Sequence, residues 1–129
     1  MIGLNYLGKM GQLGNQMFQY AALRGVADRR GLEYTVPNHK EVLEDGLGNK
    51  LRIELYDAFD INPKNQGLLP TNEYVQEAHF HFDKDLYNEC PDNCSIVGFF
   101  QTEKYFTNIR EQIIKDLSLI HISEPTRHT

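Results

Sequence analysis

Along its first third, the chain passes from an apolar segment through a glycine-rich turn into a helical pattern. Residues 2–7 are mostly apolar, as in a short buried strand, and a glycine stands at every third position from 8 to 14. A helix is then predicted, with Asn15 as its N-cap and Gly31 at its end. Small and apolar residues share one face of this helix: Met17, Phe18, Ala21, Ala22, Gly25 and Val26. The small residues on this face predict close packing on a sheet.

The residues after this helix complete a β-α-β unit and then become polar. Glu33 to Val36 is predicted as a short second strand, so the unit indicates a parallel, Rossmann-like start. Residues 38–50 are polar and are interpreted as a loop or lid. Residues 51–61 are more apolar and are expected to pack back on the domain, while 62–72 form another loop.

Two further strands and a final helix are predicted from the second half of the chain. Residues 74–82 alternate between apolar and polar, with Ala78, Phe80 and Phe82 on one face, as in a half-buried strand. Residues 95–100 lack a polar face and are predicted to form a buried strand.

The final helix is predicted from a capping box and an apolar stripe. The box is Asn108-x-x-Glu111, and it would begin the helix. The stripe consists of Ile109, Ile113, Ile114 and Leu117.

Composition fits a single globular domain. A chain of 129 residues buries roughly 65% of its unfolded surface, which supports a modest core without disulfides or metal. The net charge of −5 argues against nucleic acid as the main partner. No apolar segment approaches the ~20 residues that cross a bilayer, and no signal peptide follows Met1, so a cytoplasmic location is expected.

The glycine turn admits a functional and a purely structural interpretation. Its Gly-x-x-Gly-x-x-Gly spacing matches neither the dinucleotide fingerprint nor the P-loop, so it could be a strand-to-helix connection with nothing bound. Alternatively, the free N–H groups of the helix start would bind a phosphate, with Asn15 facing the ligand. A cap would tolerate Asp or Ser at this position, whereas a ligand contact would not; both roles could hold together.

Two segments resemble one known family. Residues 11–21, Gly-Gln-Leu-Gly-Asn-Gln-Met-Phe-Gln-Tyr-Ala, resemble the N-terminal signature of the family 11 glycosyltransferases, α-1,2-fucosyltransferases that move fucose from GDP-fucose to a galactoside hydroxyl. Residues 98–106, Gly-Phe-Phe-Gln-Thr-Glu-Lys-Tyr-Phe, are similar to that family's Gly-aromatic-Phe-Gln-Ser-Glu-Lys-Tyr-Phe segment. The resemblance covers residues 1–117.

This resemblance implies a fold and a reaction. The fold would be α/β, the Rossmann-like N-terminal domain of a two-domain GT-B glycosyltransferase, which is metal-independent and transfers fucose with inversion. The donor-binding residues would be Gly11, Gly14, Asn15 and Gln16. GDP-fucose and a galactoside glycan would be the partners, without a further cofactor. Family members that act on lipid-linked glycans could sit peripherally at the inner membrane face, although no basic amphipathic helix is present to anchor this chain.

The acceptor side is assigned to the end of the second buried strand. Gln101, Glu103 and Lys104 would emerge at its carboxyl end, where open parallel sheets bind ligands. Glu103 and Lys104 could instead be an exposed ion pair of little energetic worth. The catalytic residue stays unassigned.

The family's donor-binding arginine motif, His-x-Arg-Arg-x-Asp, is absent from this chain. The pair Arg29-Arg30 is a decoy, because Ala27 and Leu32 occupy the His and Asp places. We therefore expect the isolated chain to be inactive, since donor binding would depend mainly on a missing C-terminal domain.

Residues 118–129 do not resemble the family. They are similar to a translated sequencing adapter, and the alternative is a native tail in which Pro125 breaks the helix.

Two other classes of function compete with the enzyme. A non-catalytic Rossmann-like module that binds a nucleotide or sugar is one. A small domain with a zinc staple is the other, using His79, His81, Cys90 and Cys94. The Cys-x3-Cys spacing around a Pro-Asp-Asn turn argues against zinc, and a disulfide is not expected in a reducing compartment.

Overall fold

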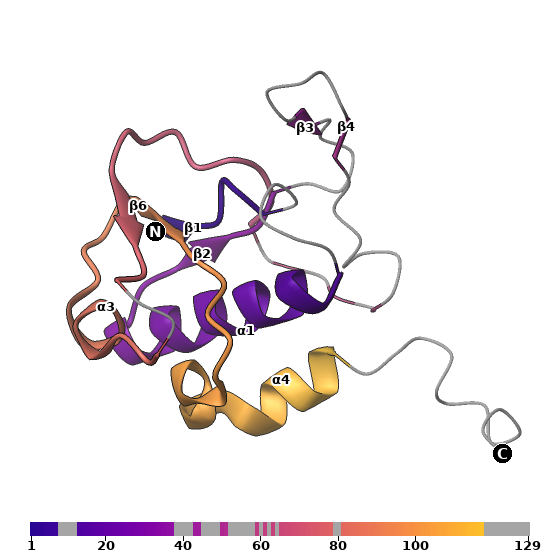
Figure 1. The fold of residues 1–129 in the computed structure, drawn as a ribbon, viewed down its shortest axis with the longest axis vertical. Coiled ribbons are helices and arrows are strands. Elements are labelled where there is room, and N and C mark those ends of the chain that lie inside the picture. Colours follow the sequence, from indigo (N-terminus) through magenta and orange to yellow (C-terminus); the bar gives the residue numbers. More distant parts are fainter. Residues whose placement is uncertain are drawn as a thin grey trace, which may run out of the picture.

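The protein is built around a four-stranded parallel sheet (Figure 1). The computed structural model describes residues 1–7, 13–37, 43–44, 50–51, 59, 61, 63, 65–78 and 81–117. The sheet has the order β2-β1-β6-β5. Its strands are β1 (Ile2–Gly3), β2 (Tyr34–Thr35), β5 (Tyr74–Gln76) and β6 (Cys94–Val97). All three pairings are parallel, which confirms the predicted α/β class and the parallel β-α-β start, an arrangement compatible with a Rossmann-like fold.

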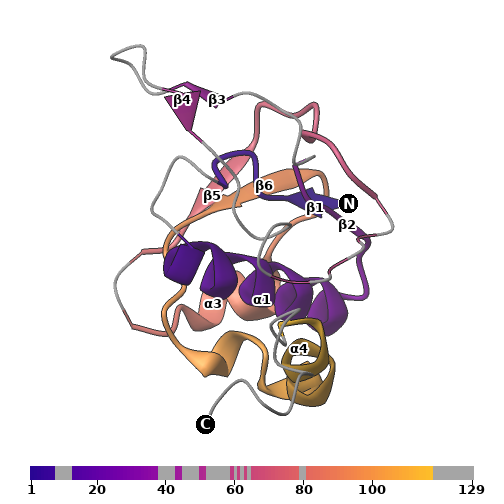
Figure 2. The same cartoon turned by 90° about the vertical axis from the view of Figure 1, so that its right-hand side faces the viewer.

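Two helices lie side by side on one face of this sheet (Figure 2). They are α1 (Leu13–Arg30), which connects β1 to β2, and α3 (Lys84–Glu89), which connects β5 to β6. Each connection moves one strand in the same direction across the sheet. Because such crossovers are right-handed, both helices must fall on the same face.

The strand order departs from the common dinucleotide-binding order after the first unit. In that order the chain crosses the sheet once and places the next strand beside β1. Here the chain crosses from β2 to the outer edge, forms β5 there, and returns inward so that β6 lies beside β1. The crossing segment passes over the face opposite α1, where Leu69 packs on Gly3.

The end of α1 follows the prediction, but its start does not. Gly31 has a left-handed φ of 68°, its N–H bonds to Asp28 O, and the Leu32 N–H bonds to Ala27 O, which together form a Schellman motif. The helix begins at Leu13, so Asn15 is its third residue, and the prediction of Asn15 as N-cap was wrong. Two helical residues, Leu13 and Gly14, therefore precede Asn15, whose side chain lies within the first turn.

Side chains on nearly every side of α1 are buried, because the helix is covered on two faces. The sheet covers one face, and η1 (Glu103–Tyr105), η2 (Thr107–Ile109) and α4 (Arg110–Asp116) cover another. The small residues of the predicted face divide between the two contacts: Ala22 lies in the main core with the sheet residues, whereas Ala21 and Gly25 face the second layer. Ala21 packs with Ile109 and Ile113, and a Cβ on Gly25 would lie 1.8 Å from the carbonyl oxygen of Tyr105.

The final helix differs from its predicted start. Asn108 does not cap it, because its amide donates to the carbonyl of Gly25 and to the carboxylate of Asp28 on α1. Ile114, predicted in the apolar stripe, is 57% exposed, and Phe18 of the α1 face is also exposed. The helix α4 is instead tied to α1 by an ion pair between Arg24 and Asp116.

Several segment boundaries also differ from prediction. The strand predicted over 74–82 ends at Gln76, and the helix α3, which was not predicted, follows its side-chain cap Asp83. Within the predicted loop 38–50, Leu43–Glu44 (β3) pairs antiparallel with Lys50–Leu51 (β4).

The remaining predictions either agree with the structure or concern residues that the structure does not describe. The predicted packing of 51–61 is confirmed at Phe59 and Ile61, which lie in the main core. No helix among the described residues is long and apolar enough to span a membrane. Residues 118–129 lie outside the described residues.

Candidate functional site

The predicted donor-binding residues divide into three environments. Gly11 lies outside the described residues. Gly14 is exposed, and a Cβ there would meet only open space. Asn15 is half-buried, whereas Gln16 is only 1% exposed, so the Gln16 side chain does not face a ligand at the surface. Gly14 and Asn15 therefore form the accessible part of the helix start.

A hydrogen bond joins the two family-like segments. The Gln101 Nε2 atom donates to Asn15 Oδ1 at 2.7 Å, although the residues lie far apart in sequence. Asn15 belongs to the first turn of α1, which follows β1, and Gln101 follows the end of β6. Because β1 and β6 are adjacent parallel strands, both side chains reach the carboxyl edge of the sheet. Among the described residues, no other hydrogen bond involves the Asn15 side-chain NH2 group or the Gln101 side-chain carbonyl.

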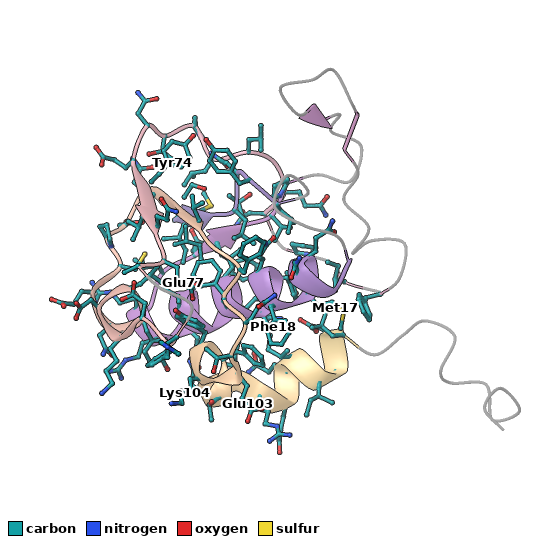
Figure 3. All side chains as sticks on the ribbon, viewed as in Figure 1. Met17, Phe18, Tyr74, Glu77, Glu103 and Lys104 are labelled. Atoms are coloured by element: carbon teal, nitrogen blue, oxygen red, sulfur yellow. The ribbon has the colours of Figure 1, made fainter. Side chains whose placement is uncertain are left out.

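Glu103 and Lys104 do not join this pair. Both are exposed in η1, and Figure 3 shows them on the α4 side of α1. Neither side chain has a hydrogen bond or ion pair with another residue of the described ranges. Of the three residues assigned to the acceptor side, only Gln101 lies beside Asn15.

A buried network holds the turn that carries Gln101. The Tyr105 hydroxyl donates to Glu77 Oε2 at 2.6 Å and accepts the backbone N–H of Asp83 at 2.8 Å. The other carboxylate oxygen of Glu77 accepts the N–H of Phe100 at 3.2 Å. Burial, followed by the bond to Glu77, raises the pKa of Tyr105. The network therefore fixes the chain on both sides of Gln101.

The turn itself is held in an unusual backbone conformation. Phe100 has a φ of 50°, which is uncommon for a residue with a side chain, and its ring is fully buried. The ring meets Tyr105 edge to face, with 5.2 Å between centroids. Such geometry persists only where the surroundings enforce it, and here the Phe100 N–H is held by the carboxylate of Glu77.

Sequence reasoning missed the role of Glu77. Its position on the polar side of an alternating strand is typical of a solvated side chain. Asp83 was also missed, although an Asp followed three residues later by a buried Leu86 is a common helix start. Tyr105 lies within the second family-like segment, which was the available signal.

The proposed zinc staple gains no geometric support from the described residues. Cys90 and Cys94 are buried free thiols with 3.5 Å between sulfur atoms, and they fill core space at the end of α3 and the start of β6. Their mutual hydrogen bond and burial raise the pKa of Cys90. His81 is exposed, His79 lies outside the described residues, and no group of three or more metal-binding side chains occurs within them.

Comparisons with protein-family models, with curated proteins and with solved structures find no match for this chain.

Proposed function

We propose that this chain is the donor-facing N-terminal part of a galactoside α-1,2-fucosyltransferase with GT-B architecture. The observation that carries the proposal is the hydrogen bond between Asn15 and Gln101, which brings the two family-like segments together. Their meeting point lies at the carboxyl edge of a parallel sheet and at the start of an 18-residue helix. Both features favour an anionic or hydroxyl-rich ligand.

In the proposed reaction, this chain contributes binding and charge stabilisation. The bond between fucose C1 and the diphosphate oxygen breaks, a bond from C1 to the galactoside hydroxyl oxygen forms, and the hydroxyl proton passes to a general base, which stays unassigned. Negative charge then develops on the departing GDP. The backbone N–H groups in the first turn of α1 and the Asn15 side-chain NH2 group would stabilise that charge, while the Gln101 side-chain carbonyl would accept a hydrogen bond from a sugar hydroxyl.

Gln16 is not included among the proposed contacts. Its buried side chain packs within the domain, so it acts on the site only by supporting the first turn of α1. Glu103 and Lys104 are left out of the primary contacts as well, because they project on the α4 side.

A nuclear magnetic resonance titration tests the proposal directly. GDP-fucose added to the isotope-labelled chain is expected to shift the side-chain amide signals of Asn15 and Gln101 and the backbone signal of Gly14. The affinity should be weak, about millimolar, because these residues carry no His-x-Arg-Arg-x-Asp motif. Free fucose should leave the same signals in place, since it lacks the diphosphate.

A matched pair of variants makes the test specific. Asn15→Ala should abolish the shifts, whereas Asn88→Ala, an exposed asparagine on α3, should preserve them. GDP-fucose shifts that avoid Asn15 and Gln101, or no shifts at all, would overturn the proposal.

A further inference from the structure

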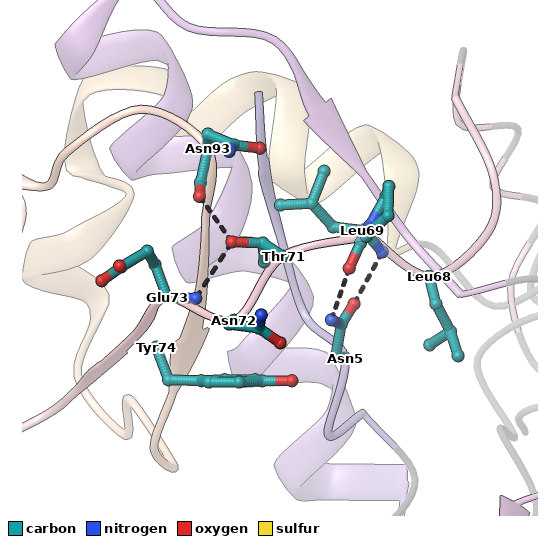
Figure 4. A pocket seen from close by; sticks show the side chains of 9 residues that line it. Asn5, Leu68, Leu69, Thr71, Asn72, Glu73, Tyr74 and Asn93 are labelled. Atoms are coloured by element: carbon teal, nitrogen blue, oxygen red, sulfur yellow. Dashed lines mark hydrogen bonds between the residues drawn. The ribbon is translucent and has the colours of Figure 1, made fainter.

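A polar hollow lies on the opposite side of the sheet from α1, away from the Asn15–Gln101 pair. It measures about 750 Å³ and is open to solvent. Figure 4 shows its wall, which is the segment that crosses the sheet before β5, together with Asn5 and Asn93. The hollow is lined by Asn5, Leu68, Leu69, Pro70, Thr71, Asn72, Glu73, Tyr74 and Asn93. None of these residues takes part in the Asn15–Gln101 pair.

The walls of the hollow are fixed by side-chain-to-backbone hydrogen bonds. The Asn5 amide donates to Leu69 O at 2.9 Å and accepts the Leu69 N–H at 2.8 Å (Figure 4). The Thr71 hydroxyl donates to Asn93 O at 2.8 Å and accepts the N–H of Glu73 at 3.0 Å. A ligand would therefore meet a shape that already exists, with little ordering cost.

The chemistry of the hollow combines one aromatic face with unpaired polar groups. Tyr74 is 47% exposed, and its ring packs against Tyr6 with 5.6 Å between centroids. Within the described residues, the side chains of Asn72, Glu73 and Asn93 have no hydrogen-bond partner and are exposed. They add amide donors, amide acceptors and one carboxylate to the lining of the hollow.

Charge excludes one class of ligand. No Lys or Arg is among the described lining residues, and Glu73 supplies a negative charge. A phosphate or another anion would find no partner for its charge there. An uncharged molecule with an apolar face and several hydroxyls would fit, since the ring can cover the face while amides and carboxylate bind the hydroxyls.

We propose that this hollow is a binding site for an uncharged saccharide, in which Tyr74 stacks on a sugar ring and Asn72, Glu73 and Asn93 bind its hydroxyls. The site is separate from the donor-facing edge and does not depend on the proposed transferase activity.

Titration of the labelled chain with lactose and with maltose tests this site. Either sugar is expected to shift the side-chain amide signals of Asn72 and Asn93 and the backbone signal of Tyr74. Inorganic phosphate should leave all three unchanged. Tyr74→Ala and Asn72→Ala should each weaken binding about tenfold, as expected when one contact is lost. Asn88→Ala should bind as the unaltered chain does.

Several outcomes would overturn the site. They are the absence of shifts with both sugars, shifts with phosphate, and undiminished binding by Asn72→Ala, whose exposed side chain can be removed without harm to the core. The sugar titration is independent of the GDP-fucose titration, because the two experiments observe the signals of different residues. Failure at Asn15 and Gln101 would reject the transferase proposal and leave the saccharide site standing.

Discussion

Asn15 illustrates how a side chain near a helix start can have two separable roles. The side-chain oxygen Oδ1 of Asn15 accepts a hydrogen bond from Gln101 Nε2, which links α1 to the segment after β6. Its side-chain NH2 group is the part that the proposed function assigns to the ligand. Because one atom serves the fold and another serves the proposed site, substitutions can affect the two roles differently.

Asn15→Asp should separate stability from binding. The aspartate keeps an acceptor for Gln101 and places a negative charge in the first turn of α1, which favours the helix by about 0.3–1 kcal/mol. The same charge repels a diphosphate. We expect an unchanged or slightly raised free energy of unfolding in urea, together with loss of the GDP-fucose shifts. Retained shifts would show that Asn15 does not contact the donor.

Two glycines of α1 provide a matched pair for the packing of the helix. Gly25→Ala would drive a Cβ to 1.8 Å from the backbone oxygen of Tyr105, so η1 must move away. We expect a loss of about 3 kcal/mol in the free energy of unfolding. Gly14→Ala meets open space and should stabilise the helix by about 0.5–1 kcal/mol.

Urea unfolding followed by circular dichroism measures both glycine variants. A Gly25→Ala variant as stable as the parent would mean that η1 does not approach α1 as closely as described.

At the scale of elements, strands and long helices were the most predictable parts. The apolar runs after the first helix and before Gly98 predicted β2 and β6, and the parallel sheet follows from the β-α-β pattern. The short helix α3 was missed because its six residues contain one buried anchor, Leu86. The predicted face of α1 was right in part: Ala22 and Val26 lie in the core with the sheet, whereas Ala21 and Gly25 meet the second layer, since a helix covered on two sides has no single apolar stripe.

The contact between η1 and the residue that follows β5, Glu77, depends on Tyr105. Tyr105→Phe removes the donor to Glu77 and the acceptor for Asp83, and we expect a loss of about 1–2 kcal/mol in the free energy of unfolding. The raised pKa also sets a pH dependence. The folded state holds this proton more tightly, so the stabilisation is full below the ordinary tyrosine pKa and decreases as pH rises above it.

Urea titrations at neutral and alkaline pH check this dependence. The parent chain should lose stability above about pH 10, and Tyr105→Phe should lose less over the same range. Tyr20 contributes in the same direction, because burial raises its pKa too, so a part of the alkaline loss should remain. An identical slope in parent and variant would contradict the role assigned to Tyr105.

At the scale of the whole molecule, the candidate site could be predicted only in part. The carboxyl edge of the sheet and the residues Asn15 and Gln101 follow from strand position and family resemblance. The network behind them could not be predicted, because Glu77 and Tyr105 come together only through the order in which β5 and β6 enter the sheet. Periodicity carries no information about that order.

The chain alone should show no fucosyl transfer from GDP-fucose to lactose. The groups proposed to contact the donor are the first turn of α1 and the side-chain amides of Asn15 and Gln101. The arginine motif that the resemblance assigns to a C-terminal domain is not among these 129 residues. GDP should likewise leave the thermal midpoint almost unchanged, since a ligand near its Kd adds only about 0.4 kcal/mol. Release of GDP coupled to a colour assay measures the first expectation, and a thermal melt measures the second. Robust turnover would show that the donor site lies within these residues.

The central place of β1 has a consequence for synthesis. Ile2 pairs with Tyr34 on one side and with Cys94 on the other, so β1 completes its pairing only after β6 has been made. While the residues between β2 and β6 are synthesised, β1 has one unpaired apolar edge, which is prone to aggregation and a target for chaperones.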